Sequence, residues 1–255
     1  MSPVGAVARR RLEGTRQILR LNWSQYVAGA AVLTAAVTAA AWSGTHPLPR
    51  LAALAAAALT GWLLLASVSA SWWIYDRSDL YAWTWVLDGL PAPPGRWAVL
   101  HAGFDEAGPG LGALLDGPPV AVLDVGRFLP RWTASLRRAR RRAPGPPDQA
   151  ARVDALPLAD GAVDTAFVIF AAHELRRCSD RASLFAELAR VLGPGGAVVL
   201  VEHPRDLANV LVFGPGAWHF HPRGEWLRRA AEAGFSVRAE LARTPFVKGW
   251  VLCLD

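Results

Sequence analysis

Imidazole and carboxylate side chains follow two apolar segments of this 255-residue chain. His173 comes shortly after residues 167–170, while Glu202 and His203 come directly after residues 197–201. The ordinary pKa of histidine is near 6.5, so an imidazole at such a position can take up a proton near neutrality. His173, Glu202 and His203 are therefore predicted to be catalytic. For His173 the equal alternative is that its ring only satisfies a backbone carbonyl at the end of a strand.

A second set of polar side chains suits substrate binding rather than proton transfer. His219 and His221 alternate as they would on one face of an extended segment, which is also a metal-ligand pattern. The sequence offers no third ligand beside them, and neither cysteine belongs to a metal-ligand spacing. No metal is predicted. The candidate substrate-binding residues are Tyr75, Arg77, Glu174, Arg205, His219 and His221.

The elements that must position these side chains follow from the apolar pattern. Residues 167–170 and 197–201 are short apolar runs bounded by polar residues, which is typical of strands buried on both faces. Between them Leu184, Leu188 and Val191 recur with helical spacing, and the glycines and proline at 193–196 predict the end of that helix. A strand, a helix and a strand in this order predict a parallel pair with a right-handed crossover.

Three motifs of this region resemble the later motifs of class I S-adenosylmethionine-dependent methyltransferases, especially small-molecule and quinone-type members. They are Asp-Ala-Leu-Pro-Leu-Ala-Asp-Gly-Ala-Val-Asp at 154–164, His-Glu-Leu at 173–175 and Ala-Arg-Val-Leu-Gly-Pro-Gly-Gly at 189–196. The resemblance covers about residues 97–255. It implies an α/β fold with a Rossmann-like, mostly parallel seven-stranded sheet, closed by an antiparallel C-terminal hairpin from residues 234–241 and 247–254.

The resemblance also implies that the cofactor is S-adenosyl-L-methionine, held at the carboxyl ends of the first strands. In the loop after the first strand, residues 96–101, only Gly103 matches the glycine-rich pattern of the family. Asp124 ends the second strand and is implied to bind the ribose hydroxyls, with a helix N-cap or a solvated loop residue as the alternatives. Asp154 is expected at the end of the third strand and is implied to bind the adenine. The implied cofactor-binding residues are His101, Gly103, Asp105, Asp124, Asp154, Ala155 and Ala171.

The front of the chain differs in kind. Residues 21–45 and 51–75 carry no charge, and each run exceeds the 20 or so apolar residues that cross a bilayer. Small residues at 31, 35 and 39 are expected to pack the two helices together. Arginines precede the first run, namely Arg9, Arg10, Arg11, Arg16 and Arg20. By the positive-inside rule, this places the N-terminus and the catalytic domain in the cytoplasm and predicts a multi-pass protein of the cell membrane. A soluble helical hairpin that caps the domain is the alternative.

The predicted domain organisation has four parts. Residues 1–20 form a basic cytoplasmic segment, residues 21–75 a transmembrane hairpin, residues 76–95 a juxtamembrane linker and residues 96–255 the methyltransferase-like domain. In the linker, Trp83 and Trp85 are expected either at the membrane interface or over the active site. The arginines of residues 137–142 are expected to be a solvated helix face or to contact anionic headgroups.

The net charge of +6 does not by itself indicate binding of nucleic acid, because nearly all of the basic residues are arginines in a composition rich in Ala, Gly and Pro. The sequence also contains no groove-reading or stacking module. The sequence therefore predicts a membrane-anchored methyltransferase that acts on a lipophilic small molecule such as a quinone, phenol, isoprenoid or lipid. The alternative is a non-catalytic membrane scaffold with a degenerate methyltransferase fold. The sequence indicates no particular oligomeric state.

Overall fold

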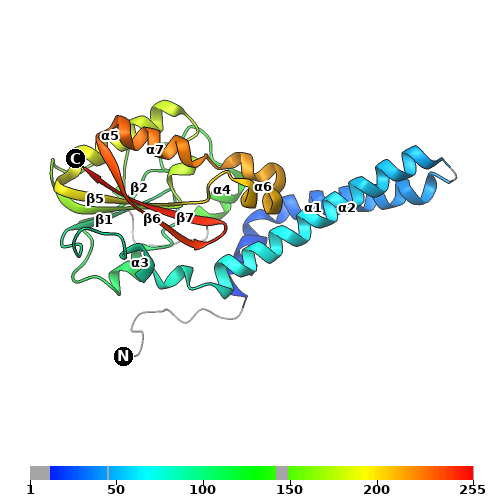
Figure 1. Cartoon of the computed structure of the whole chain (residues 1–255), viewed down its shortest axis with the longest axis horizontal. Helices are drawn as coiled ribbons and strands as arrows, with labels where there is room; N and C mark the ends of the chain where they lie inside the picture. Colours follow the sequence, from blue (N-terminus) through cyan, green and yellow to red (C-terminus); the bar gives the residue numbers. More distant parts are fainter. Residues whose placement is uncertain (1–11, 45, 142–148, 255) are drawn as a thin grey trace.

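A helical hairpin projects from one end of an α/β domain in the computed structural model of the chain (Figure 1). The structure describes residues 12–44, 46–141 and 149–254. Arg9, Arg10, Arg11 and Arg142 lie outside the described residues, so the basic segment and the arginine run are described only in part.

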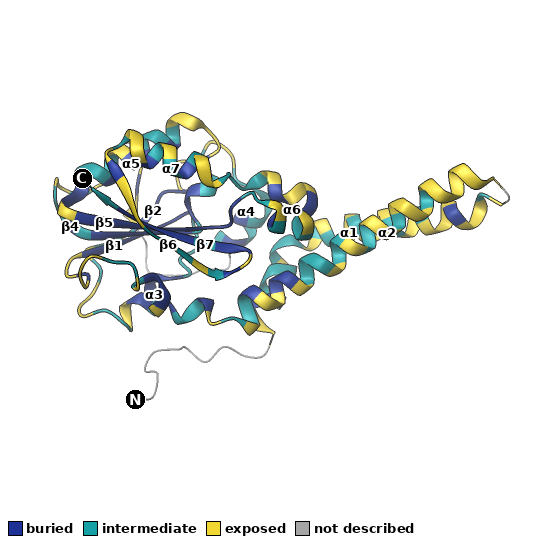
Figure 2. Ribbon diagram, viewed as in Figure 1, coloured by how far each residue is buried: buried dark blue, intermediate teal, exposed yellow. Residues whose placement is uncertain are grey.

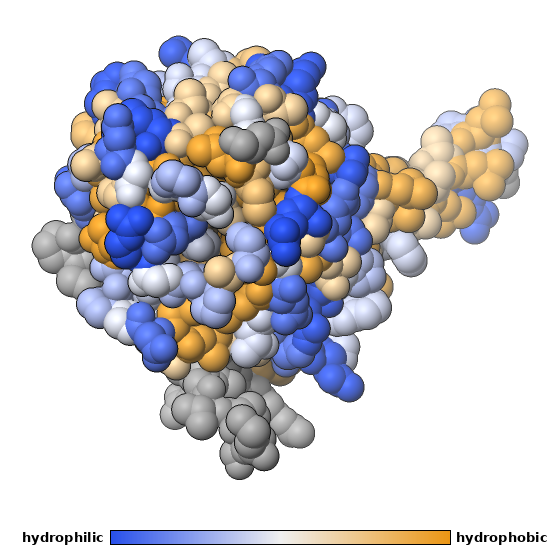
Figure 3. Space-filling model, turned by 60° about the vertical axis from the view of Figure 1, so that its left-hand side comes forward, coloured by the Kyte–Doolittle hydropathy of each residue, from blue (hydrophilic) through white to orange (hydrophobic). Residues whose placement is uncertain are grey.

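The hairpin consists of α1 (Glu13–Trp42) and α2 (Pro47–Trp72). Both helices are long and apolar enough to cross a membrane, and only 6% of the most apolar window of each is buried inside the protein. A core helix of a soluble domain would be mostly buried, whereas the outer part of this hairpin is mostly exposed (Figure 2) and the part of it in view in Figure 3 is largely apolar. The expected packing of Ala31, Ala35 and Ala39 on α2 is wrong, because all three residues are exposed. In α1 it is Gly29 that lies against Leu64 of α2.

A seven-stranded sheet forms the centre of the domain, in the order β3-β2-β1-β4-β5-β7-β6. The first five strands pair in parallel, whereas β7 pairs antiparallel with both β5 and β6. The predicted fold, with its parallel sheet and antiparallel C-terminal hairpin, is therefore confirmed. The strands are β1 (Trp97–His101), β2 (Ala121–Asp124), β3 (Gln149–Ala150), β4 (Val163–Ile169), β5 (Leu192–Glu202), β6 (Phe235–Thr244) and β7 (Val247–Leu254).

Each face of the sheet has its own hydrophobic core, because alternate residues of a strand point to opposite faces. On one face Leu100 and Val168 pack with buried residues of α5 (Cys178–Val191) and α7 (Arg223–Glu232). On the other face Val99 and Phe167 pack with α3 (Gly108–Gly112) and with residues 74–86. Figure 1 shows α5 and α7 on one side of the sheet and α3 on the other.

Residues 76–95 are not a free connection. They include two short 3-10 helices, η2 (Leu80–Ala82) and η3 (Thr84–Val86), which lie on the sheet. The side chains of Trp83 and Trp85 are only 1% and 5% exposed, so they belong to the core and not to a membrane interface or a roof over the active site. The hairpin is therefore joined to the sheet by packed structure.

Asp76 fixes the start of the hairpin. It lies in the π-helix η1 (Trp73–Arg77), which continues α2, and its carboxylate accepts hydrogen bonds from the backbone amides of Gly14 and Thr15 at 2.9 and 2.7 Å. These amides belong to the first turn of α1, which has no cap of its own, so the end of α2 caps the start of α1. The two helices thus meet at the surface of the domain.

Some boundaries differ from those predicted. The helix α5 ends at Val191, and the backbone of residues 193–196 is already within β5, where Gly195 adopts a φ of +72°. The third strand ends at Ala150, so Asp154 lies in a turn beyond it and not at its end. The remaining elements are α4 (Ala134–Arg140), η4 (Ala172–Glu174), α6 (Leu207–Phe213) and η5 (Gly214–His219).

Candidate active site

The carboxyl ends of β1 and β2 bring together the predicted cofactor residues His101, Gly103 and Asp124. His101 and Asp124 are direct neighbours in the parallel register of the two strands. The backbone amide of Gly103 donates to Nδ1 of His101 at 3.0 Å, in a turn where Gly103 has a φ of +100° that favours glycine. The carboxylate of Asp124 accepts from the amide of Gly126 at 3.0 Å and is almost buried.

Arg140 lies over this loop, which the sequence did not predict. Its guanidinium forms a salt bridge with Asp124 at 2.7 Å, and it covers the α-carbon of Gly103 so closely that a β-carbon there would lie 2.4 Å from Nε. The ring of Trp132 stacks on its other side, 4.5 Å from the guanidinium carbon. Helical periodicity could have indicated this position, because Arg140 is four residues after the buried Leu136 on the same face of α4.

These residues fit a nucleoside with a charged amino-acid end. Nε of Arg140 is buried without a hydrogen-bond partner, which is costly unless a polar group of a ligand meets it. The carboxylate at the end of β2 suits ribose hydroxyls, and the guanidinium of Arg140 lies beside it over Gly103. In this arrangement Asp124 would hold the ribose of S-adenosylmethionine, while Arg140 would meet the carboxylate of its methionine end.

The other predicted cofactor residues are spread more widely. The carboxylate of Asp105 turns back to accept from the amides of Ala107 and Gly108 at the start of α3. Asp154 is exposed and pairs with Arg152 at 2.8 Å, and Ala155 is exposed beside it. Ala171 is fully buried after β4. The structure therefore gathers His101, Gly103 and Asp124 into one site but leaves Asp154 and Ala155 on the surface.

A buried ion pair joins the ends of β4 and β5. Nδ1 of His173 lies 2.7 Å from the carboxylate of Glu202, which also accepts from the backbone amide of His173 at 3.1 Å. Burial by itself lowers the pKa of His173, but the charge and hydrogen bond of Glu202, with the charge of Glu174, raise the pKa to about 9. His173 is therefore protonated at neutral pH in this arrangement, which suits it to donate a proton rather than to remove one.

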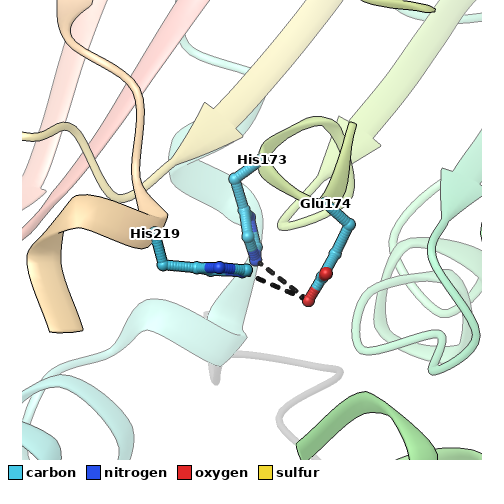
Figure 4. A group of neighbouring side chains, drawn as sticks. All are labelled: His173, Glu174 and His219. Atoms are coloured by element: carbon cyan, nitrogen blue, oxygen red, sulfur yellow. Dashed lines mark ion pairs between the residues drawn. The ribbon is translucent and has the colours of Figure 1, made fainter. Parts of the chain in front are cut away.

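Glu174 and His219 complete a cluster with His173. Oε1 of Glu174 lies 3.4 Å from Nε2 of His219 and 3.8 Å from Nε2 of His173 (Figure 4). Burial raises the pKa of Glu174, but the hydrogen bond from His219 and the neighbouring imidazole charges lower it below its ordinary value. Arg176 donates to the backbone carbonyl of His219 at 2.5 Å. The structure thus brings the first histidine of the alternating pair to the end of β4.

His203 sits in an aromatic cage beside this cluster. Its ring stacks between Phe170 and Phe220, with centroid distances of 5.0 and 5.1 Å. Nδ1 lies 2.9 Å from the carbonyl oxygen of Phe246, which can only accept, so Nδ1 carries the proton and Nε2 accepts from the hydroxyl of Tyr75 at 3.1 Å. Burial, together with the charge of His173, lowers the pKa of His203 to about 4, so this imidazole is neutral at pH 7.

We expect the neutral state of His203 to make the fold sensitive to acid. Its pKa falls from 6.5 in the unfolded chain to about 4 in the folded protein, so its contribution is complete above pH 6.5 and is lost as the pH falls toward 4. Between pH 7.5 and 5 this loss is about 2 kcal/mol, from ~1.4 kcal/mol per pKa unit. Thermal unfolding of the protein in detergent, followed by near-UV circular dichroism at both pH values, measures the loss.

The matched variant for this prediction is His203→Gln, which keeps a polar side chain but has no ionisable group. Between pH 7.5 and 5 the free energy of unfolding of this variant should fall by about 2 kcal/mol less than that of the natural protein. An identical fall in both proteins would mean that other groups cause the acid sensitivity, of which His221 is the first candidate because burial and the charge of Arg181 also lower its pKa to about 4.

The remaining predicted substrate residues lie apart from the cluster. Nε2 of His221 faces Arg181 at 3.3 Å, and the ring packs edge-on against Trp226, so this histidine does not join His219. Arg205 donates its backbone amide to the carbonyl of His221, and Arg77 is exposed at the end of η1. Tyr75, Glu174 and His219 are thus the predicted substrate residues that the fold brings to the edge of β4 and β5.

The prediction missed Phe170 and Phe220, which make the walls of the cage. Phe170 has a φ of +50°, a left-handed conformation that is rare for a bulky residue and turns the chain at the end of β4. Phe220 follows η5 and is far from Phe170 in the sequence. Their apolar side chains resemble any other core residue in the sequence, so only the fold reveals that they enclose His203.

The strand order, the acid at the end of β2 and the polar edge of β4 and β5 are those of a class I methyltransferase fold. A family model described as a methyltransferase domain matches residues 130–200, from the start of α4 to near the end of β5. This match supports the predicted class and its cofactor, S-adenosyl-L-methionine.

Individual relatives share this domain at low identity. Over 89 residues the chain is 34% identical to the ubiquinone/menaquinone biosynthesis C-methyltransferase UbiE of Acidiphilium cryptum, a match that spans 35% of this chain and 34% of that protein. The fold matches an S-adenosylmethionine-dependent methyltransferase from Aquifex aeolicus with a TM-score of 0.50 and 18% identity, over 71% of this chain and 94% of the other. A methyltransferase from Thermotoga maritima matches with a TM-score of 0.50 and 15% identity, over 73% and 94%.

Proposed function

We propose that the protein is a membrane-anchored methyltransferase that transfers a methyl group from S-adenosylmethionine to a lipophilic small molecule. The hairpin α1–α2 crosses the membrane, with the catalytic domain on the cytoplasmic side, where Arg16 and Arg20 lie at the start of α1. The observation that carries the proposal is the hydrogen bond between Tyr75 and His203, because it joins the end of the membrane hairpin to the acceptor side of the sheet.

An apolar surface next to the hairpin supports access from the bilayer. The helix α6 lies against α2, where the indole nitrogen of Trp62 donates to the carbonyl of Leu211 at 2.9 Å. Leu207 and Leu211 of α6 are 73% and 51% exposed, and Trp218 of η5 is 62% exposed. Trp62 is ten residues before the end of α2, or about 15 Å along the helix, so α6 lies at the depth of the cytoplasmic leaflet.

The cage is suited to an aromatic or unsaturated acceptor. Phe213 packs edge-on against both His203 and Phe220, which connects α6 to the cage through apolar rings. A lipophilic acceptor that enters along α6 would therefore exchange one apolar environment for another. The clustered imidazoles at the end of the path supply the polar contacts that would orient its reacting atom.

The chemistry divides between the cofactor and these residues. The sulfonium of S-adenosylmethionine supplies an electrophilic methyl group, so the protein must mainly position the acceptor and exclude water. Neutral His203 is placed to hold a hydroxyl group of the acceptor through Nε2 in place of Tyr75. The protonated His173 is placed to donate a hydrogen bond toward an oxygen that gains negative charge.

The test is the dependence of methyl transfer on the tail of the acceptor. The full chain in lipid nanodiscs is given S-adenosylmethionine with a labelled methyl group and hydroquinones that share one ring but carry no tail, a short prenyl tail or a long one. We expect kcat/KM to rise at least tenfold from the tail-less to the long-tailed acceptor, because each added methylene favours the membrane by about 0.8 kcal/mol. The protein in detergent is the control, where this preference should shrink. Equal rates for all tails in nanodiscs would rule out access from the bilayer.

The second candidate function is a non-catalytic membrane scaffold. The observation that favours it is Arg140, whose guanidinium fills the space over Gly103 and already pairs with Asp124. A scaffold of this kind would not bind S-adenosylmethionine at all, whereas the proposed enzyme binds it at micromolar concentrations.

A further inference from the structure

We propose that His173, Glu174 and His219 form a binding site for one divalent transition-metal ion of the zinc type. The three residues come from two places in the chain, since His173 and Glu174 lie in η4 after β4 and His219 ends η5 (Figure 4). An ion bound to Nε2 of His173 would replace the proton that this imidazole carries in the metal-free protein, so the test below measures metal binding and not methyl transfer.

The distances between the ligand atoms fit one ion. One ligand atom of each of the three residues lies within 4.8 Å of the others, and Oε1 of Glu174 is 3.4 and 3.8 Å from Nε2 of His219 and of His173. In a tetrahedral zinc site with bonds of about 2.0 to 2.1 Å, ligand atoms are about 3.3 Å apart. Small side-chain rotations would therefore complete three bonds and leave a fourth position open.

The charges of the cluster call for a cation. The side chains of Glu202 and Glu174 are 0% and 10% exposed, and both carboxylates face His173. The imidazolium of His173 compensates for one of these two carboxylates, and the second stays costly without a further positive charge. Arg176 contacts His219, but its side chain is exposed. An ion between the three ligands would supply two positive charges within the cluster.

The contacts around the ligands also suit a metal. Glu202 holds Nδ1 of His173 at 2.7 Å, which leaves Nε2 directed at the cluster, an arrangement that commonly supports histidine ligands of zinc. Nδ1 of His219 lies 3.2 Å from Arg176, so metal binding requires this arginine to keep only its bond to the carbonyl of His219. Two imidazole nitrogens and one carboxylate oxygen favour zinc and similar transition metals over magnesium or calcium, which prefer oxygen ligands.

The experiment uses the full chain in detergent after treatment with a chelator and gel filtration. Zn²⁺ is titrated by calorimetry, and Co²⁺ by its visible absorption, which reports tetrahedral coordination. We expect one Zn²⁺ per chain with micromolar or tighter affinity. Glu174→Gln and His219→Gln should each weaken Zn²⁺ binding at least tenfold and abolish the tetrahedral Co²⁺ spectrum. His219 is 27% exposed, so its variant is expected to fold, and its far-UV circular dichroism confirms this before titration.

The control variant is His46→Gln, which removes an exposed histidine before α2, far from the cluster. It should bind Zn²⁺ like the natural protein. The proposal is overturned if the folded natural protein binds no Zn²⁺ below millimolar concentration, or if Glu174→Gln and His219→Gln bind it as tightly as His46→Gln does.

Discussion

Asp124→Asn is expected to weaken the binding of S-adenosylmethionine by about 100-fold or more. The carboxylate of Asp124 is almost buried at the end of β2, where the two ribose hydroxyls of the cofactor would donate to it. A hydrogen bond to a charged group contributes about 1.5–3 kcal/mol, so two of them amount to about 3–6 kcal/mol. Because every 1.4 kcal/mol is a factor of ten in affinity, the loss exceeds 100-fold. Calorimetry on the full chain in detergent measures it.

The comparison is Asp154→Asn, which removes a carboxylate of the same kind from the surface. Asp154 is 49% exposed and pairs only with Arg152, so we expect its variant to bind the cofactor within about threefold of the natural protein. If both variants lose binding equally, Asp154 must move to the cofactor when it binds. If the natural protein itself binds no S-adenosylmethionine, the scaffold is the better account of the fold.

Glu202→Gln is expected to lower the free energy of unfolding by about 3 kcal/mol. Glu202 is fully buried, and its hydrogen bonds to the ring and the backbone amide of His173 hold the ends of β4 and β5 together. Removing one charge of a buried pair leaves the other without compensation, which costs about 3–5 kcal/mol. For a chain of this size the midpoint of thermal unfolding should fall by about 6–12 °C. The measurement is made at pH 7 with a chelator present, so that no metal contributes.

The control for this variant is Asp164→Asn. Asp164 pairs with Arg96 at 2.6 Å, almost the same distance as in the buried pair, but the two side chains are 43% and 54% exposed. Exposed pairs contribute about 0–1 kcal/mol, so the midpoint should fall by no more than about 2–4 °C. Equal losses in the two variants would show that burial does not set the strength of the His173–Glu202 pair.

The order of the elements and the polar edge of the sheet could be predicted from local patterns. Apolar runs at 167–170 and 197–201 are parts of β4 and β5, and the helical spacing of Leu184, Leu188 and Val191 is that of α5. These patterns can be recognised within a short stretch of sequence, because side chains repeat every two residues in a strand and every 3.6 residues in a helix. The polar residues that follow strands in the sequence also meet in space, since the carboxyl ends of parallel strands share one edge.

Several partners could not be predicted, because they depend on side chains that are distant in sequence. The spacing of Arg140 from Leu136 places it on the inner face of α4, unlike the exposed Arg137, but only the packing of α4 beside the end of β2 brings it to Asp124. Trp83 and Trp85 follow an apolar helix as interfacial residues do, yet they fill one face of the sheet. The sequence cannot separate these cases, because a tryptophan suits both a core and a membrane interface.

By itself, the sequence of this protein determined the class I methyltransferase sheet, the apolar hairpin and the position of His173, Glu202 and His203 at one edge. The tertiary structure alone decided how these groups are charged and what they face. His173 and His203 have the same side chain, yet the carboxylate of Glu202 raises the pKa of the first to about 9, while burial and the charge of His173 lower that of the second to about 4. The state of an ionisable group is set by burial and by the charges within a few ångströms, and these come from segments that only folding brings together.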